Sequence, residues 1–249
     1  MKRLSVCVVT LNEEAQLRAC LESVAWADEI VVVDAESTDK TAQVAREFTD
    51  RVIVRPWPGF AAQKNHALEQ AMGDWILSLD ADEQVSAELR FRIETVLRAD
   101  GPATGYSMPR KNIFWDRWVR HGRLYPDWQL RLFRRGRGRF GDFAVHESVV
   151  IDGEVARLDA PLVHTSYRDV SDCLARFDRY ATLAADEWIR HRRRVTATDL
   201  LVRPLGRFAS MYVLHAGFLD GWRGFFLASL YAHYVFVRAV KVWEKMRAR

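Results

Sequence analysis

The sequence predicts an α/β protein in which helices flank a mostly parallel sheet, followed by a helical C-terminal extension. Short apolar runs alternate with helical patterns over residues 1–100, and strands separated by helices of this length form βαβ units. The run Ile30–Val33 is continuously apolar, which is typical of a strand buried on both faces of a parallel sheet. Residues 200–249 contain instead two long aromatic and apolar stretches.

The alternation starts with a strand over Leu4–Val9 and a helix over Glu14–Val24, in which apolar residues recur every three or four positions. After the strand Ile30–Val33, Ser37 or Thr38 is expected to cap the next helix. The other elements expected in this region are a strand over residues 52–54, a helix over 61–72 that stops at Gly73, a strand over 75–79 and a helix capped by Ser86.

Beyond residue 100 the pattern is less regular. Strand-like segments occur at Gln129–Phe133 and Val145–Ile151, and a long helix is expected over Ser171–Arg194. The apolar stretches 208–219 and 225–237 are separated by Asp220-Gly221-Trp222-Arg223-Gly224. We therefore predict a first domain over residues 1–168, with halves 1–100 and 101–168, and a helical extension over residues 169–249.

Composition excludes several classes of protein. Hydrophobic residues make up 49% of the 249 residues and charged residues 28%, which excludes disordered, collagen-like and low-complexity chains. The net charge of +4 is too small to indicate nucleic-acid binding by itself. The three cysteines, Cys7, Cys20 and Cys173, show no C-x-x-C spacing, which favours a reducing, cytosolic compartment. The first apolar run is too short for a signal peptide.

Carboxylates follow the predicted strands. Asp34 comes after the second strand, and Asp80 and Asp82 come after the fourth. Ligands of open α/β sheets bind beyond the carboxyl ends of the strands. Because no glycine-rich phosphate loop follows the first strand, a diphosphate would be held through a cation, and hard oxygen ligands suit Mg²⁺ or Mn²⁺. The alternative is a solvated turn with helix-capping acids.

Four motifs taken together resemble those of inverting family-2 glycosyltransferases, which have the GT-A fold. The motifs are Thr10-Leu11-Asn12-Glu13, residues 31–41, Lys64-Asn65 and Leu79-Asp80-Ala81-Asp82-Glu83. Three later segments resemble bacterial lipopolysaccharide inner-core β-glycosyltransferases, of the β-1,4-glucosyltransferase type: Arg120-His121-Gly122, residues 125–133 and Val145-His146-Glu147-Ser148. The two resemblances cover residues 4 to about 165.

The family resemblance implies a role for each matching position of the donor site. Thr10, Leu11 and Glu13 would line the nucleoside pocket, and Asp34 would contact the base or ribose. Lys64 would reach the base or diphosphate, and Asp80 would lie near the ribose and metal. Asp82 would ligate the metal, with His164 as a further metal or diphosphate ligand. The alternative for Lys64 is an exposed helix charge, and for His164 a structural role. Many members have Asp-Gly-Ser where this chain has Ala35-Glu36-Ser37, so the shape of that loop is an open question.

Inverting transfer needs a base that takes the proton of the acceptor hydroxyl. Glu147 is the favoured candidate and Asp127 the second; the alternative for each is a structural salt bridge with a nearby arginine. His121 and Arg131 are candidates for contact with the acceptor or diphosphate. Eight arginines between Arg117 and Arg139 are either a docking surface for a phosphorylated lipid acceptor or a solvated face of paired charges.

The C-terminal extension is expected to associate with a membrane. Its apolar run Phe225–Val237 has 13 residues, fewer than the roughly 20 that span a bilayer. Flanking basic residues and Trp222 and Trp243 favour an interfacial helix pair on anionic lipid. The alternative is a buried C-terminal helix or an oligomer contact. The expected location is the cytoplasmic face of the bacterial inner membrane, as a peripheral protein.

The function expected from these features is transfer of a hexose, glucose from UDP-glucose, to a lipid-linked saccharide of the lipopolysaccharide inner core. One alternative keeps the fold and uses polyprenyl phosphate as acceptor. Another is a non-catalytic scaffold that binds nucleotide sugar, although a scaffold has no need of the carboxylates. No nucleic-acid partner is expected, because one would explain the arginines and not the acidic strand ends.

Overall fold

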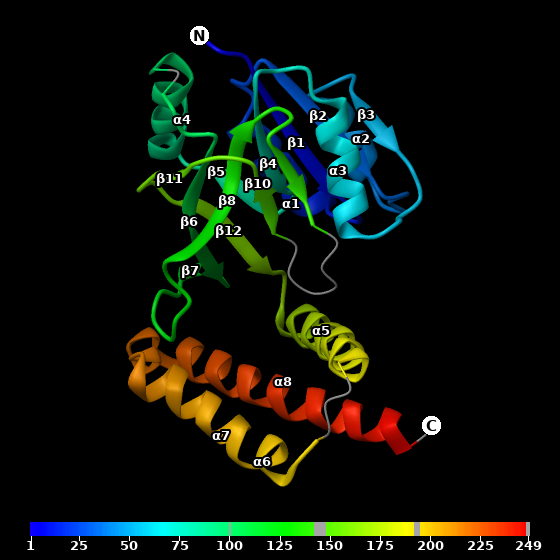
Figure 1. Ribbon diagram of the computed structural model, residues 1–249, viewed down its shortest axis with the longest axis vertical. Helices are drawn as coiled ribbons and strands as arrows, with labels where there is room; N and C mark the ends of the chain where they lie inside the picture. Colours follow the sequence, from blue (N-terminus) through cyan, green and yellow to red (C-terminus); the bar gives the residue numbers. More distant parts are fainter. Residues whose placement is uncertain (100, 142–147, 192–194, 248–249) are drawn as a thin grey trace. The chain divides into compact units, whose positions relative to one another are not determined.

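The computed structural model describes residues 1–99, 101–141, 148–191 and 195–247 (Figure 1). The described residues divide into two compact units. The first lies within Met1–Arg110, Trp128–Phe143 and Glu147–His164. The second lies within Lys111–Asp127 and Thr165–Arg249.

The main sheet has the strand order β3-β2-β1-β4-β8-β6-β12-β5 among the described residues, with β7 and β11 paired to β6. The first four strands of this order are parallel to one another, as the sequence predicts, and β8 is antiparallel to β4, so the complete sheet is mixed. The strands are β1 Leu4–Thr10, β2 Glu29–Asp34, β3 Val52–Val54, β4 Trp75–Asp80, β5 Glu83–Val85, β6 Gly105–Phe114, β7 Arg117–Trp118, β8 Asp127–Arg134, β11 Val155–Arg157 and β12 Leu162–Tyr167; β9 Gly138–Phe140 and β10 Val149–Ile151 form a separate pair.

Helices cover both faces of the parallel strands. Val32 of β2 belongs to a core that also contains side chains of α1 (Glu14–Ser23), α2 (Thr41–Arg46) and α4 (Ala87–Ala99). Its neighbours Val31 and Val33 belong to a second core, with side chains of α3 (Phe60–Gln70). All three valines are fully buried. The apolar run in β2 is therefore buried on both faces, as predicted, and the α/β class is confirmed.

Two expected helix caps have different outcomes. The Ser86 hydroxyl accepts a hydrogen bond from the Leu89 amide at 3.1 Å, which confirms the cap of α4. The expected cap of α2 by Ser37 or Thr38 is wrong, because α2 starts only at Thr41. The Ser37 hydroxyl donates instead to Asp34 Oδ1 at 2.5 Å. Asp34, at the end of β2, thus binds the Ser37 side chain, which the sequence pattern predicted as a cap of α2.

The second unit contains a helical C-terminal region. Its elements are α5 Val170–Arg190, α6 Ala197–Leu200, α7 Val202–Ala209, the π-helical turn η1 Ser210–Leu214, the 3-10 turn η2 Gly217–Asp220 and α8 Gly221–Arg247. The predicted break over residues 220–224 begins earlier in the structure, at His215 and Ala216. Gly224 lies inside α8, and a Cβ there would come within 1.8 Å of the Gly217 carbonyl oxygen. The glycine that suggested a break therefore permits a close approach of η2 to α8.

Helix α8 is longer than the 13-residue apolar run suggested. It has 27 residues, and the helical stretch Gly217–Arg247 is long and apolar enough by length and composition to cross a membrane, with 28% of its most apolar window buried inside the protein. Within the second unit α8 packs against α5, where Phe177 and Leu230 share a small core with Cys173. One such helix is weak evidence for a membrane span.

Candidate active site

The carboxyl ends of three neighbouring strands bring together the polar residues that the sequence singled out. Thr10, the last residue of β1, is in register with Asp34, the last residue of β2. Asp80, which ends β4, is in register with Val9 of β1. Both Thr10 and Asp34 are buried. The ends of these neighbouring strands therefore place Thr10, Asp34 and Asp80 at one edge of the sheet.

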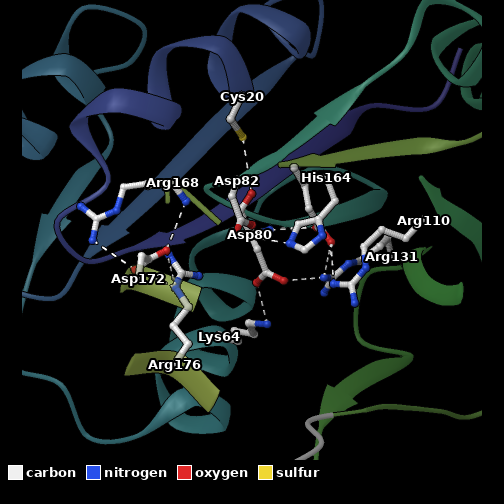
Figure 2. Close-up of polar contacts among 11 residues, drawn as sticks. Cys20, Lys64, Asp80, Asp82, Arg110, Arg131, His164, Arg168, Asp172 and Arg176 are labelled. Carbon is white, nitrogen blue, oxygen red and sulfur yellow. Dashed lines mark hydrogen bonds and ion pairs between the residues drawn. The ribbon is translucent and has the colours of Figure 1, made fainter. Parts of the chain in front are cut away.

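Asp80 lies between two cations (Figure 2). Its Oδ1 is 2.8 Å from Lys64 Nζ, and its Oδ2 accepts a hydrogen bond from Arg131 at 2.5 Å. Arg131 also donates to Glu83 Oε1 at 2.6 Å, and Arg110 lies 3.6 Å from the same oxygen. The fully buried Glu83 in turn accepts from the Asp80 amide through Oε2 at 3.0 Å. Three cations and two carboxylates therefore form one connected network in the first unit.

The network shifts the pKa values of two of its members, Asp80 and Arg131. Burial raises the pKa of Asp80, but Arg131 and Lys64 outweigh that effect and hold this pKa well below its usual range. Burial alone would lower the pKa of Arg131. The neighbouring carboxylates of Asp80 and Glu83 raise it by more, so the pKa of Arg131 lies above its usual value. Asp80 and Arg131 are therefore both ionised at neutral pH. Lys64 is buried in α3, so its alternative interpretation as an exposed helix charge is wrong.

Asp82 and His164 face each other beside this network (Figure 2). His164 is brought there because β12 pairs antiparallel with β5, which places His164 opposite Glu83. Its Nε2 lies 3.3 Å from Asp82 Oδ2, and both side chains are largely buried. The Asp82 carboxylate is a ligand that suits Mg²⁺ or Mn²⁺, whereas the His164 imidazole suits a transition metal such as Mn²⁺ better than Mg²⁺.

The pair would supply two protein donors to a cation. Within the part of the chain that the structure describes, no group of three or more His, Cys, Asp or Glu side chains is arranged to hold a metal ion. Magnesium is commonly bound by one or two carboxylates together with substrate phosphates. Asp82 and His164 therefore fit a cation whose remaining ligands come from a diphosphate and water.

Comparison with known proteins decides the family. The model of Glycosyl transferase family 2 matches residues 5–150, which is more than half of the chain. This chain is a family-2 glycosyltransferase. It is 32% identical to the lipopolysaccharide core biosynthesis glycosyltransferase LpsC of Rhizobium meliloti, over 97% of this chain and 92% of LpsC. It is also 27% identical to the uncharacterized glycosyltransferase RT0209 of Rickettsia typhi, over 98% of this chain and 88% of that protein.

Solved structures share the fold of this glycosyltransferase. The mannosyltransferase PcManGT of Pyrobaculum calidifontis, solved with GDP-Man and Mn²⁺, superposes with a TM-score of 0.58 at 18% identity, over 98% of this chain and 88% of that one. TarS 1–349 of S. aureus, solved with UDP-GlcNAc, superposes with a TM-score of 0.51 at 17% identity, over 99% and 92%. The expected GT-A fold is confirmed.

The loops after β1 and β2 of the glycosyltransferase are joined to each other. Both Asp34 oxygens accept hydrogen bonds from Ser37, and the Ser37 hydroxyl also accepts from the Asn12 amide at 2.8 Å. Asn12 Oδ1 accepts from the Thr38 amide at 2.8 Å. Glu36 has a φ of +57°, a conformation that favours glycine. Glu36 therefore adopts a left-handed backbone conformation at the position where the family resemblance implies glycine.

The other residues expected to bind nucleoside lie on the same loop. Leu11 is 42% exposed, and Glu13 stands at the N-cap position of α1. The Glu13 amide donates to Thr41 Oγ1 at 2.9 Å. These contacts are compatible with a nucleoside pocket, whose residues remain a prediction.

The acceptor-side candidates lie in different places. Asp127 begins β8, and Glu147, the favoured base, lies outside the described residues. Arg131 is 5% exposed and belongs to the buried network. His121 is in the second unit, where its Nδ1 lies 2.9 Å from Asp220 Oδ1. The arginine-rich segment is thus of mixed character: Arg131 is used internally, while others are on the surface.

Sequence reasoning missed two members of the network. Glu83 was noted as part of the motif after β4 and given no role, and Arg110 was not singled out. The signal for Glu83 was its position, three residues after Asp80 in a strand that begins and ends with buried side chains. Arg110 carries no comparable signal, because its partner is 27 positions away and is brought close only by the fold.

Proposed function

We propose that this glycosyltransferase moves a hexose, with glucose from UDP-glucose as the first donor to test, to a lipid-linked saccharide of the lipopolysaccharide inner core. The observation that carries the proposal is the Asp82–His164 pair beside the ionised Asp80 network at the strand ends. The name of the LpsC relative supports the acceptor class. The nucleotide-sugar complexes of PcManGT and TarS support the donor class.

Asp82 and His164 would hold Mg²⁺ or Mn²⁺ in this proposal. When bound, the cation supplies positive charge that offsets the charge developing on the leaving nucleoside diphosphate. Lys64 and Arg131 add fixed positive charge next to Asp80. The Asp80 carboxylate holds the Lys64 and Arg131 side chains in place. Thr10, Leu11, Glu13 and Asp34 orient the nucleoside.

The remaining requirement is a base for the acceptor hydroxyl. Glu147 stays the favoured candidate and Asp127 the second. A carboxylate within hydrogen-bond reach of the hydroxyl removes its proton as the bond to the anomeric carbon forms, which contributes about 10²–10⁴-fold in rate. Glu147→Gln and Asp127→Asn are therefore each compared with the unaltered protein. The true base is the position at which kcat falls by that factor while donor binding is unchanged.

The acceptor class implies a place of action. We propose that residues 1–168 form the catalytic domain and that residues 169–249 associate with an anionic membrane, on the cytoplasmic face of the bacterial inner membrane. A lipid-linked acceptor is confined to that surface. The three free, buried cysteines are compatible with a reducing compartment.

The test is release of UDP from UDP-glucose by the full chain, with Mn²⁺ or with EDTA, in the presence of lipopolysaccharide inner-core acceptor. We expect release only with metal and acceptor, and loss of release in Asp82→Asn. The control is Asp152→Asn, because the Asp152 side chain is 83% exposed and pairs only with Arg137 in the structure's described part. Release that is unaffected by EDTA and by Asp82→Asn would contradict the proposal.

The two alternatives give different results in the same assay. If polyprenyl phosphate and not the inner-core saccharide stimulates UDP release, the acceptor assignment is wrong and the transferase assignment stands. A scaffold would bind UDP-glucose and release no UDP with either acceptor.

A further inference from the structure

Large apolar side chains are exposed together in the second unit. The turns η1 and η2 and the first turn of α8 present five of them to solvent, with Leu214 77% exposed and Phe218 50% exposed. We call this set the apolar patch; its members are Val213, Leu214, Phe218, Leu219 and Trp222. Large apolar side chains exposed together on neighbouring turns favour an interaction site.

A basic loop is fastened to the apolar patch. The Gly122 amide donates to the His215 carbonyl at 2.8 Å, next to Leu214 in the chain. The His121 amide donates to Asp220 Oδ2 at 2.8 Å, next to Leu219. Trp115 stacks on Trp222 with ring centroids 5.6 Å apart. The loop 115–123 and the apolar patch therefore belong to one surface of the second unit.

Three arginines of this loop are exposed: Arg117, Arg120 and Arg123. None of them forms an ion pair with a carboxylate in the described portions of the sequence. Lys111 and Arg120 lie over the ring of Trp118, at 4.9 Å and 5.5 Å from its centroid. The rim of the apolar patch therefore combines uncompensated positive charge with an aromatic side chain.

The basic residues of α8, which the sequence suggested as membrane anchors, are used inside the second unit. Lys241 lies 2.6 Å from Asp178, and Lys245 pairs with Asp186, both on α5. Arg223 donates to the carbonyl of Trp115 and pairs with Asp116 at 3.0 Å. Arg238 of α8 lies over the ring of Trp188, 4.7 Å from its centroid. These four cations therefore have partners within the second unit, whereas Arg117, Arg120 and Arg123 have no carboxylate partner among the described residues.

We propose that the apolar patch and its basic rim dock on an anionic lipid bilayer. The apolar side chains would enter the boundary between headgroups and acyl chains, and the arginines would contact lipid phosphates. Trp222 and Trp118 suit the same depth, because indole rings concentrate at membrane interfaces. The inference deepens the membrane part of the proposed function and rests on it.

The alternative interpretation is that a second copy of this chain binds to the apolar patch. In a two-fold contact through the apolar patch, the arginine rims of both copies would meet, and like charges at an interface are unfavourable. An anionic bilayer complements the same charges. The observations therefore favour lipid.

The test is co-sedimentation of the full chain with vesicles of phosphatidylcholine containing phosphatidylglycerol, and with vesicles of phosphatidylcholine alone. We expect binding to the anionic vesicles. Arg117→Glu/Arg120→Glu should weaken it by at least about 25-fold, since each basic residue near an anionic surface contributes about 1 kcal/mol. Leu214→Gln/Leu219→Gln should weaken it by about tenfold or more.

Matched controls alter equivalent residues in the first unit. Arg92→Glu/Arg135→Glu changes net charge equally at two exposed arginines, and Phe91→Gln/Met72→Gln replaces two exposed apolar side chains. Both controls should bind vesicles like the unaltered protein. Equal binding by the patch variants, or no binding by the unaltered protein, would overturn the proposal. A dimer that dissociates in Leu214→Gln/Leu219→Gln, without vesicle binding, would overturn it in favour of a second copy.

A spectroscopic measurement covers the case in which a patch variant fails to fold. Burial raises the pKa of Cys7 to about 12 and that of Cys20 well above its usual value, and all three native cysteines are buried. A polarity-sensitive dye can therefore be attached selectively to Phe218→Cys. Its emission should shift on adding anionic vesicles, while the same dye on Phe91→Cys should not respond; no shift at position 218 would overturn the proposal. UDP release without vesicles tests the transferase assignment separately.

Discussion

The Asp80 carboxylate, at the end of β4, forms ion pairs with two cationic side chains, Lys64 and Arg131. Its own ionisation is opposed by burial and favoured by Arg131 and Lys64, and the two cations have the larger effect on its pKa. Glu83 holds Arg131 from the other side. Removing one charge from such a network leaves the opposite charges under-compensated.

The first prediction concerns Asp80→Asn. A carboxyl group with a lowered pKa in the folded state stabilises the protein above the pKa of the unfolded chain, and that stability is lost as pH falls. Because Asp80 is partly exposed, we expect Asp80→Asn to lower the free energy of unfolding at pH 7 by about 1–3 kcal/mol. The deficit should shrink below about pH 4, where the unfolded chain takes up the proton.

Urea denaturation at neutral and acidic pH measures this effect. Asp152→Asn is the control, and its change at pH 7 should stay within about 0.5 kcal/mol, since an exposed ion pair contributes little. An Asp80→Asn deficit that is absent at pH 7, or that does not depend on pH, would show that the network does not act as described.

The second prediction concerns Glu36, which is exposed and has a φ of +57°. A residue with a Cβ pays about 1 kcal/mol for this conformation, and glycine does not. Glu36→Gly should therefore raise the free energy of unfolding by about that amount. The matched control is Glu22→Gly within α1, which should lower it by about 1 kcal/mol. If both variants are destabilised alike, the loop does not hold Glu36 in a strained state.

At the scale of elements, the sequence predicted those that carry their own periodic signal. Apart from β5, the strands and helices of residues 1–100 were found because Val31, Val32 and Val33 form an uninterrupted apolar run and because α4 places Leu89, Ile93 and Leu97 on one buried face. Such patterns depend only on neighbouring residues. They survive folding because the core buries the same side chains that the pattern marks.

Other elements carry no such signal. Strand β6 contains Pro109, Arg110 and Lys111, and its burial pattern does not alternate. Strands β5 and β12 are short and pair across a separation of about 80 positions. Their existence depends on partners far away in the sequence, so local patterns could not predict them. For the same reason the predicted helix break over residues 220–224 included Gly224, which the fold uses for close packing.

The third prediction tests that packing. Gly224→Ala would place a Cβ 1.8 Å from the Gly217 carbonyl oxygen, so η2 and α8 must move apart. We expect a loss of about 1–3 kcal/mol in the free energy of unfolding, as for other overpacked sites. Gly206, in α7, has nothing within 4 Å of a Cβ, so Gly206→Ala should stabilise by about 0.5–1 kcal/mol. Equal effects of the two substitutions, measured by thermal denaturation, would contradict this account of Gly224.

For the whole molecule, the sequence predicted the location of the site better than its internal contacts. Asp34 and Asp80 could be expected at the carboxyl ends of parallel strands because the alternation of strands and helices predicts where each strand ends; that β1 and β2, and β1 and β4, are neighbours is known from the structure. The contact of Asp82 with His164 could be guessed only from a resemblance, since 82 residues separate them. The ion pairs of Lys241 with Asp178 and of Lys245 with Asp186 also join residues far apart in the sequence, so the sequence could not show that these two cations have partners within the protein.

The central claim is that Asp82 and His164 hold a divalent cation against the diphosphate of a sugar nucleotide. The most direct measurement is calorimetric titration of UDP into the full chain, with Mn²⁺ and again with EDTA. We predict binding with Mn²⁺ that weakens by about tenfold or more with EDTA, in Asp82→Asn and in His164→Ala, and that is unchanged in Asp152→Asn. Equal affinity for UDP in all of these conditions would contradict the claim.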